Sequence, residues 1–374
     1  MLTIPARNAL FGLARRCQGL CTDCLGGVTS GFQSNAAPAA AGQWGGYLLT
    51  GTSAATSIVD SPRFLVTGSS GQVGTELVAF LREKVGPGAV IASDVRSSRK
   101  LSADGPFVYC DVQDKDNLAR IILENGITYI VHLATLLSAV GERNPQLALK
   151  INTAGIQNVL DLAMTHNLQV YSPSTIAVFG RTSQKVMTPD DTVMMPTTMY
   201  GITKVHQELL GQYYSDRFGV DYRSLRYPGI ISAKAPPGGG TTDYAVEIYH
   251  AALATRTYTC FLAEDAVLPM MYMPDCLAAT WQLMMAPKSS LTRTTYNCTA
   301  MSFSPGELVG SITKVLPDFA CTFTPDFRND IAATWPRSLD DSNARRDWGW
   351  EHKYNVDDMT QHMLLSLQQP SNKP

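Results

Sequence analysis

The chain has 374 residues, and its 30 lysines and arginines nearly balance its 32 aspartates and glutamates, which gives a formal net charge of −2. This balance leaves no basic stripe for a phosphate backbone, so we expect no nucleic-acid partner. The longest apolar stretch, residues 127–140, is shorter than the roughly 18–20 residues that span a bilayer, so we expect no membrane partner either.

Residues 1–60 differ in composition from the rest of the chain. They contain arginine but no lysine, have no acidic residue before Asp23, and are rich in serine, threonine, glycine and alanine. This composition is typical of an organellar transit peptide. A disordered tail that carries no targeting signal is the alternative. Cys17, Cys21 and Cys24 have the spacing of a metal-cluster motif, but little apolar sequence surrounds them, so we expect no metal site.

From Pro62 onward, short apolar runs alternate with amphipathic stretches. Strands are predicted at 63–67, 89–93, 107–110, 128–133, 168–174 and 221–226, and helices at 72–84, 114–125, 144–166 and 198–218. This alternation predicts an α/β fold, a doubly wound parallel sheet of the Rossmann type with helices on both faces.

After Pro228 the regular alternation gives way to the segment KAPPGGGTT and mixed short elements. We therefore divide the folded part into a dinucleotide-binding domain at 61–230 and a smaller substrate-binding lobe at 231–370, which caps the carboxyl edge of the sheet and returns in part to it. Ligands bind at that edge in folds of this kind.

A glycine-punctuated turn lies between the first strand and the first helix. Gly68, Gly71 and Gly74 leave room for a pyrophosphate to approach the positive end of the helix, where Gln72 and Val73 lie in the first turn. An ordinary glycine turn is the alternative, and the position between strand and helix favours the binding site.

Acidic and apolar residues follow the next strands. Asp94, at the end of the second strand, is placed to bind the adenosine ribose and to select NAD over NADP, although a solvated aspartate would fit the same sequence. Asp111 and Val112 are predicted to contact the adenine, and Leu133 and Ala134 to lie close to the cofactor.

His132 precedes that last pair, inside an apolar strand. A histidine in such a place is more often a core residue than a catalyst. We therefore leave His132 out of the predicted site.

A phenol and an amine lie one helical turn apart in the segment YGITK. Tyr200 and Lys204 share a helix face, and a nearby ammonium would lower the tyrosine pKa from its ordinary value of about 10, so Tyr200 is a candidate general base. The pattern is common by itself. Ser174 and Thr175, which end the fifth strand, supply hydroxyls to orient a reacting oxygen, unless they are ordinary turn hydroxyls.

The segments TGSSGQVG, HLAT, SPSTIAVFG, YGITK and LRYPGI occur in the order found in the extended short-chain dehydrogenase/reductase family, which is NAD-dependent epimerase/dehydratase-like. The chain resembles that family over nearly all of residues 62–355. The resemblance implies NAD as cofactor, Tyr200 and Lys204 as the catalytic pair, and Thr175 as the third member. It also implies cofactor contacts from Asn152, Tyr227 and Gly229, and a homodimer through helices 144–166 and 198–218.

More narrowly, HLATLLSAVGE, LPMMYMPDC and the long segment around GGGTT resemble the branch of the family that oxidises the 3-hydroxyl of threonine with NAD, in mitochondria when the organism is eukaryotic. This implies an enzyme of the mitochondrial matrix, with an amino-acid substrate. Polar groups for the substrate are then expected from Ser138, Ser174, Thr175, Tyr200, Thr241 and Thr242, with Trp335 as a lid and closure of 232–242.

Two other functions fit parts of the pattern. A nucleotide-sugar 4-epimerase with tightly held NAD uses the same tyrosine, lysine and hydroxyl set, but needs basic and aromatic residues for a UDP group, which LPMMYMPDC lacks. A non-catalytic dinucleotide-binding subunit commonly loses the tyrosine or the lysine, and this chain retains both.

Overall fold

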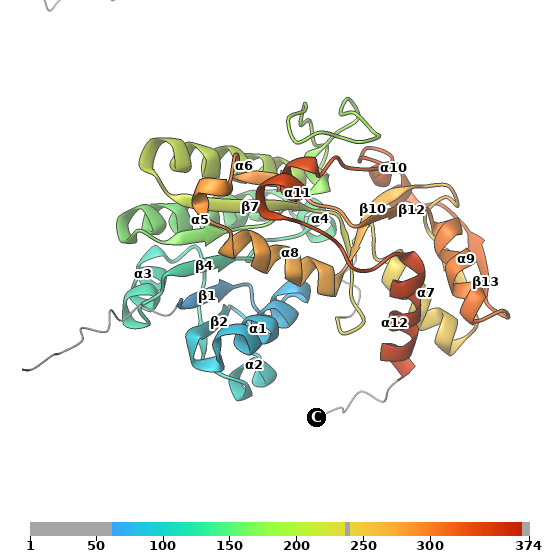
Figure 1. The fold of residues 1–374 in the computed structure, drawn as a ribbon, viewed down its shortest axis with the longest axis horizontal. Helices are drawn as coiled ribbons and strands as arrows, with labels where there is room; N and C mark the ends of the chain where they lie inside the picture. The colour runs from blue at the N-terminus through green and yellow to red at the C-terminus, as the bar shows by residue number, and fades with distance from the viewer. Residues whose placement is uncertain (1–61, 236–239, 369–374) are drawn as a thin grey trace, which may run out of the picture. The chain divides into compact units, whose positions relative to one another are not determined.

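The computed structural model describes residues 62–235 and 240–368, and its central element is a parallel sheet (Figure 1). The strand order is β3-β2-β1-β4-β5-β7-β11, with β6 paired to β7. From β1 the chain winds outward through β2 and β3, then returns to build the other half. The predicted doubly wound α/β fold is confirmed. Its strands are β1 (Phe64–Thr67), β2 (Val90–Asp94), β3 (Phe107–Tyr109), β4 (Tyr129–His132), β5 (Gln169–Tyr171), β6 (Ser174–Thr175), β7 (Asp221–Tyr227) and β11 (Thr295–Asn297).

Helices cover both faces of this sheet because successive side chains of its strands point to opposite sides. Phe64 and Val66 of β1 pack in one core with α1 and α8, whereas Leu65 packs in another with α3 and α5. The helices of this part are α1 (Gln72–Val85), α2 (Arg99–Ala103), α3 (Lys115–Glu124), α4 (Ser138–Arg143), α5 (Pro145–His166), α6 (Met199–Phe218), α8 (Met273–Met285) and α11 (Ser342–Trp348).

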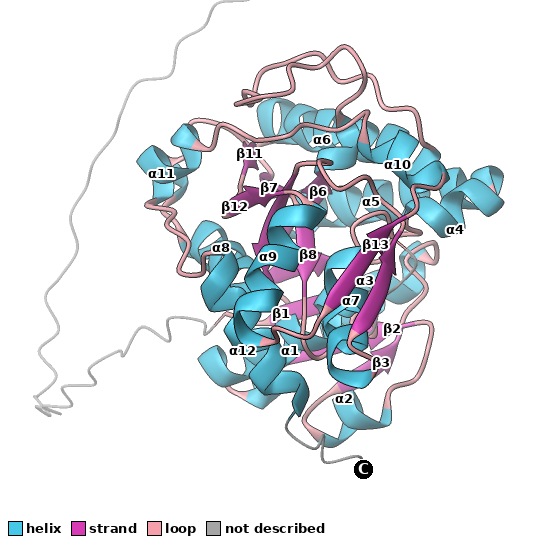
Figure 2. Ribbon diagram, turned by 90° about the vertical axis from the view of Figure 1, so that its right-hand side faces the viewer, coloured by secondary structure: helices cyan, strands magenta, loops and turns pink. Residues whose placement is uncertain are grey.

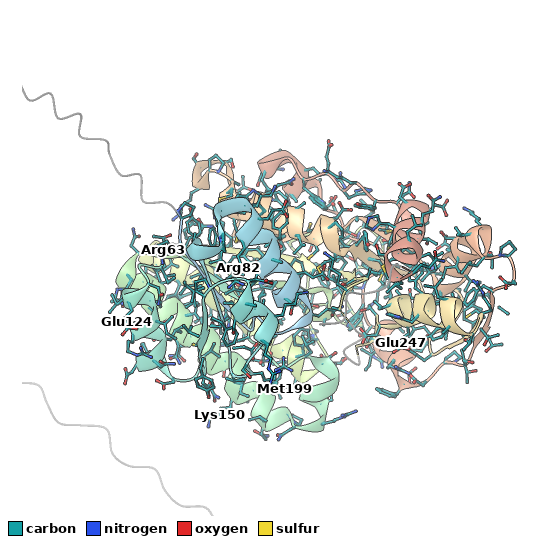
Figure 3. All side chains as sticks on the ribbon, turned by 90° about the horizontal axis from the view of Figure 1, so that it is seen from below. Arg63, Arg82, Glu124, Lys150, Met199 and Glu247 are labelled. Carbon is teal, nitrogen blue, oxygen red and sulfur yellow. The ribbon has the colours of Figure 1, made fainter. Side chains whose placement is uncertain are left out.

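The side chain of Arg82, which is labelled in Figure 3, anchors α1 to a neighbouring segment. Its side chain is buried and donates hydrogen bonds to the carbonyl oxygens of Leu101, at 2.8 Å, and Pro106, at 2.7 Å. This guanidinium therefore ties α1 to the segment that leads into β3.

A smaller set of elements follows β7 and gathers on the side that faces the viewer in Figure 2. Strands β12, β10 and β8 form one small sheet, and β13 pairs with β9 in another. Hydroxyls join the helices, since Thr360 of α12 is hydrogen-bonded to Tyr249 of α7 and to Ser311 of α9. The bounds are β8 (Gly229–Ile231), β9 (Thr257–Cys260), β10 (Leu268–Tyr272), β12 (Met301–Phe303), β13 (Ala320–Phe323), α7 (Tyr244–Ala254), α9 (Pro305–Val315), α10 (Phe327–Ala332) and α12 (Val356–Gln368).

After the small sheets, helix α11 and the turn that carries Trp350 complete the core. Helix α11 ends at Gly349, whose φ of 71° is in the left-handed region, and the next residue, Trp350, is fully buried. The indole nitrogen of Trp350 donates to the carbonyl oxygen of Thr299 at 3.0 Å. Within residues 62–235 and 240–368, no helix is long and apolar enough to cross a membrane.

Candidate functional site

The turn between β1 and α1 depends on two close backbone approaches. Gly68 has φ +70°, and a Cβ there would lie 2.6 Å from the backbone nitrogen of Ala134, just after β4. A Cβ on Gly74 would lie 2.4 Å from the carbonyl oxygen of Gly68. Real Cβ atoms do not come this close to backbone atoms, so both positions require glycine. Because of these glycines, the turn folds back tightly onto the first turn of α1 and lies against the end of β4.

The N-terminus of α1 is open to an anion. Gly71 is its N-cap and supplies no side-chain hydrogen bond to the free N–H groups of the first turn. The side-chain nitrogen of Gln72, in the same turn, is buried without a hydrogen-bond partner among the described residues. Uncapped backbone N–H groups, a favourable helix dipole and an unpaired amide together fit a pyrophosphate.

Asp94 lies beside the same turn, at the end of β2. Its side chain is 6% exposed, and its carboxylate accepts hydrogen bonds from the backbone N–H groups of Ser70 and Arg96, both at 3.0 Å. The alternative of a solvated aspartate does not describe so buried a group. The guanidinium of Arg96 lies 3.7 Å from the Asp94 carboxylate but is largely exposed to solvent. It therefore does not remove Asp94 from the predicted binding site.

The predicted adenine residues follow β3. The carboxylate of Asp111 accepts a hydrogen bond from the backbone N–H of Gln113 at 3.0 Å, which shapes the turn. Val112 is buried against α5, where a Cβ on Gly155 would lie 2.9 Å from it. Both residues therefore lie at the carboxyl end of the sheet, as do Leu133 and Ala134 beside Gly68.

His132 is a core residue, as its place in an apolar strand predicts. Its Nδ1 is hydrogen-bonded to the hydroxyl of Thr67 at 2.9 Å, and its side chain is buried. Burial, and to a lesser degree the charge of Lys204, lower the pKa of His132 to about 3. The imidazole is therefore neutral at working pH.

Asn152 joins two segments rather than presenting a free amide. Its oxygen accepts from the backbone N–H of Leu136 at 2.8 Å, and its nitrogen donates to the hydroxyl of Thr203 at 3.0 Å. That hydroxyl in turn donates to the carbonyl oxygen of Tyr200 at 2.9 Å. The predicted cofactor residue thus holds the segment after β4 against the helix of the catalytic pair. Thr203, which no sequence signal marked, completes the link.

The predicted phenol, hydroxyl and amine converge in the structure. The side chain of Thr175 lies close enough to Tyr200 to lower the pKa of the phenol, and the ammonium nitrogen of Lys204 lies 5.8 Å from the centre of the Tyr200 ring. The Lys204 nitrogen donates to the carbonyl oxygen of Pro173, at 2.8 Å, and to the side chain of Gln207, at 2.9 Å. Helix α6 supplies the tyrosine and lysine, and β6 supplies the hydroxyl.

Burial acts on the two ionisable groups in opposite directions. It raises the pKa of Tyr200 to about 12, against a lowering by the hydrogen bond from Thr175. It lowers the pKa of Lys204 to about 7, against a raising by the charge of Glu208. Both shifts disfavour the charged form, so the Tyr200 phenol is neutral in the free protein and Lys204 loses its proton near neutral pH.

Ser174 does not share the position of Thr175. Adjacent strand residues face opposite sides, and the Ser174 hydroxyl donates to the carboxylate of Glu208 at 2.5 Å. With 2% of its surface exposed, Ser174 has its hydroxyl engaged inside the protein. Thr175 is therefore the strand-end hydroxyl that faces Tyr200.

Gly201 lets the first turn of α6 reach Thr175. A Cβ on Gly201 would lie 2.3 Å from the carbonyl oxygen of Ala177, in the short 3₁₀ turn that follows β6. The N-cap Thr198 accepts a hydrogen bond from the Gly201 N–H at 3.1 Å. The glycine directly after Tyr200 in the segment YGITK is the sequence signal that could indicate this contact.

Tyr227 and Gly229, two of the predicted cofactor residues, lie in different surroundings. A Cβ on Gly229 would lie 2.8 Å from the side chain of Thr242, so this glycine brings the smaller lobe to the end of β7. The hydroxyl of Tyr227 instead lies in the core, hydrogen-bonded to Tyr171 at 2.8 Å and to Thr280 at 2.5 Å.

The remaining substrate candidates lie in three places. Thr241 is buried next to Thr242, and Ser138 begins α4 partly exposed. Trp335 is 8% exposed and belongs to the core of the smaller lobe, a poor position for a moving lid. Residues 236–239, in the middle of the predicted closing segment, lie outside the described residues.

Comparisons with known proteins identify a family and several relatives of this chain. The model of the NAD dependent epimerase/dehydratase family matches residues 64–299. A mitochondrial L-threonine 3-dehydrogenase from Bos taurus is 48% identical over 310 residues, which cover 82% of this chain and 83% of the relative.

Solved structures give the same result. The L-threonine dehydrogenase from Phytophthora infestans has a TM-score of 0.80 and 59% identity, over 82% of this chain and 98% of its own. A monomeric L-threonine 3-dehydrogenase from a metagenome database has a TM-score of 0.78 and 46% identity, over 81% of this chain and 98% of its own.

The contact at Gly201 gives a test of the site's construction. Gly201→Ala should lower the free energy of unfolding by roughly 1–3 kcal/mol, since the neighbour it meets is backbone and cannot move aside. Gly310→Ala is the matched control, because a Cβ at this helical glycine would meet nothing within 4 Å; it should stabilise by about 0.5–1 kcal/mol. Urea unfolding followed by circular dichroism measures both, and equal effects would contradict the tight contact.

Proposed function

The chain belongs to the NAD dependent epimerase/dehydratase family, and from this premise we propose that it oxidises the 3-hydroxyl of L-threonine with NAD to L-2-amino-3-oxobutyrate. The observation that carries the proposal is the convergence of Tyr200, Thr175 and Lys204 at the carboxyl edge of the sheet. Relatives named for threonine oxidation, with about half or more of their residues identical over most of this chain, support the substrate.

The residues present fit NAD. Gly68, Gly71 and Gly74 would admit its pyrophosphate to the open N-terminus of α1, with Gln72 and Val73 in the same turn, and Asp94 would accept from its adenosine ribose. When bound, NAD supplies the acceptor for the substrate's hydride. Further contacts are assigned by position to Asp111, Val112, Leu133, Ala134 and Gly229.

Tyr200 is the general base of the proposed reaction. It takes the proton of the substrate hydroxyl as the hydride leaves the carbon that bears this hydroxyl, while Thr175 orients the reacting oxygen. Because burial raises the pKa of Tyr200 to about 12, the phenol needs help to ionise, and the Thr175 hydrogen bond and the Lys204 ammonium both provide it. The rate should therefore rise with pH until Tyr200 and Lys204 together have lost one proton, and then level off.

The amino and carboxylate groups of the substrate are assigned to residues of the smaller lobe and of α4. Thr242 is the best supported of these, since its methyl lies against Gly229 at the end of β7. Thr241 and Ser138 complete the proposed shell. We thus assign residues 61–230 to cofactor binding and residues 231–370 to the substrate lobe.

Removing the base tests the function. Purified protein with NAD and L-threonine should form NADH, followed by its absorbance, and Tyr200→Phe should lose roughly 10²–10⁴-fold in kcat while still binding NAD, because one ionisable oxygen is removed. Tyr214→Phe, on the same helix but hydrogen-bonded to Asp161, should retain the rate. No NADH from the unaltered protein would favour a 4-epimerase or a non-catalytic subunit, and full activity of Tyr200→Phe would refute the base.

Asp94 should set the choice of cofactor. Asp94→Ala removes a buried acceptor and a charge that repels a 2′-phosphate, so the preference of kcat/KM for NAD over NADP should fall about tenfold or more, from the roughly 1.5–3 kcal/mol of a hydrogen bond to a charged group. The exposed Asp116→Ala serves as control. Steady-state kinetics with both cofactors give the ratio, and an unchanged preference would move the role to another residue.

The helices α5 and α6 support a homodimer. They pack side by side on one face of the sheet, and they expose large apolar side chains: Leu147, Leu149 and Met164 on α5, and Ile202, Leu209, Tyr213 and Phe218 on α6. A four-helix bundle between two copies would cover these side chains. The metagenomic relative described as monomeric shows that the family does not require this pairing.

Charge on the proposed interface should separate the subunits. Leu209→Asp combined with Tyr213→Asp places two carboxylates on the exposed face of α6 and should give a monomer in analytical ultracentrifugation. Leu365→Asp, at an equally exposed leucine on α12, should leave the mass unchanged. A monomer in the unaltered protein, or a dimer that survives the double change, would rule out this interface.

A mitochondrial location completes the proposal. The arginine-bearing, acid-poor composition of residues 1–60 supports a transit peptide, as does the mitochondrial name of the Bos taurus relative. These residues, Cys17, Cys21 and Cys24 among them, lie outside the described part of the chain.

A further inference from the structure

A buried carboxylate lies one helical turn beyond Lys204, and the proposed chemistry does not use it. Glu208 is 4% exposed, and both of its oxygens accept hydrogen bonds from Arg226 of β7, the shortest at 2.8 Å. Its Oε1 also accepts the hydroxyl of Ser174 at 2.5 Å. One carboxylate therefore connects α6, β6 and β7, the three elements that meet at the site.

Arg226 is itself fixed from several sides. It donates to the carbonyl oxygen of Asp190 at 2.8 Å and to the side chain of Asn297 at 3.1 Å, and it lies over the ring of Phe179, 5.2 Å from its centre. A buried ion pair is costly to desolvate and is weak evidence of a stabilising role. Because Arg226 has partners on several sides, we infer that the Glu208–Arg226 ion pair is held in a fixed position for a reason other than stability.

Charges of alternating sign run from the site into the core: Lys204, Glu208, Arg226 and Asp190. Of the groups that face Lys204 from other elements, His132 of β4 is neutral and Pro173 offers a carbonyl oxygen. On its own helix Lys204 faces the amide of Gln207, which is hydrogen-bonded to the phenol of Tyr222 on β7, and the ring of Tyr200. Glu208 lies four residues further along α6, on the same buried face of the helix, and its charge favours the ammonium.

We propose that Glu208 is a positioning residue for proton transfer at Tyr200: anchored by Arg226 and Ser174, its carboxylate places a buried negative charge one helical turn from Lys204 and fixes α6 against the strand that carries Thr175. The inference deepens the proposed function and rests on it for the reaction. It also gives Ser174 a role, as an anchor of Glu208 rather than as a substrate contact.

The number of protons shared by Tyr200 and Lys204 gives this role a measurable effect on the pH dependence of the rate. When Tyr200 and Lys204 together have lost one proton, they exist either as phenolate and ammonium, the active form, or as phenol and neutral amine, the inactive form. Glu208 favours the active form because its negative charge is nearer to Lys204. Both forms carry the same number of protons, so raising the pH cannot convert one into the other.

Glu208→Gln retains the size and the hydrogen-bonding oxygen but removes the charge. Lys204 should then lose its proton about one pH unit lower, and the plateau of kcat/KM at high pH should fall about tenfold, the factor that corresponds to one unit. On the acid side both profiles should nearly coincide, because the fully protonated form dominates there. A loss by the same factor at every pH would show a structural role only and would overturn the proposal.

A measurement without substrate separates this inference from the proposed reaction. The ¹³Cε resonance of Lys204 in the NAD-bound protein, assigned by its absence in Lys204→Arg, reports the titration directly. An unchanged titration in Glu208→Gln would overturn the inference whichever reaction the protein catalyses, whereas a missing NADH signal with L-threonine sinks the reaction alone.

Two further variants guard against loss of folding. Glu208→Asp keeps the charge and should keep the Lys204 titration within a few tenths of a unit, and a shift as large as that of Glu208→Gln would count against the proposal. Asp221→Asn breaks the ion pair with Arg223, another buried arginine of β7, whose Nε lies 2.8 Å from the Asp221 carboxylate. It should cost stability without changing the titration of Lys204.

Discussion

The close approach of the first turn of α6 to the end of β6 is the contact on which the site depends. Without a side chain at Gly201, the helix lies against the carbonyl oxygen of Ala177, and Tyr200 reaches Thr175. Asn152 holds the same turn from the other side through Thr203. Bringing a helix this close excludes water, and the exclusion of water causes the opposed pKa shifts of the phenol and the amine.

Much of this arrangement could be predicted from the sequence, because strand and helix periodicity extends over whole segments. The four predicted helices and all six predicted strands are present, and parallel strands bring their carboxyl ends to one edge, which places Asp94 and Thr175 there. What could not be predicted depends on single contacts. Ser174 and Thr175 look equivalent in sequence, yet strand alternation turns one hydroxyl to Glu208 and the other to Tyr200. β11 is three residues long, too short for a clear sequence pattern, and it lies at the sheet edge paired with β7.

The same limit explains the candidates whose side chains are engaged elsewhere. Tyr227 lies at the end of β7, where the sequence places it, but its hydroxyl is taken by Tyr171 and Thr280. Trp335 lies in an irregular stretch with no periodicity to indicate its direction, and it packs into the core of the smaller lobe. Residue type and position along the chain identify a neighbourhood, whereas hydrogen-bond partners decide which side chains in it remain free.

The coupling of the two parts of the molecule follows from where their polar contacts fall. The hydroxyl of Ser232, just after β8, donates to Glu76 on α1, so the helix that would receive the pyrophosphate is joined directly to the start of the smaller lobe. Gly229 brings Thr242 to the end of β7 three residues from Arg226, the anchor of Glu208. A displacement of β7 would therefore disturb the smaller lobe and the charge beside Lys204 together. Because β7 also pairs with β6, which carries Thr175, this one strand is in contact with both the strand-end hydroxyl and the smaller lobe. Arg226, with hydrogen bonds to Glu208 and to the carbonyl oxygen of Asp190, joins that strand to α6.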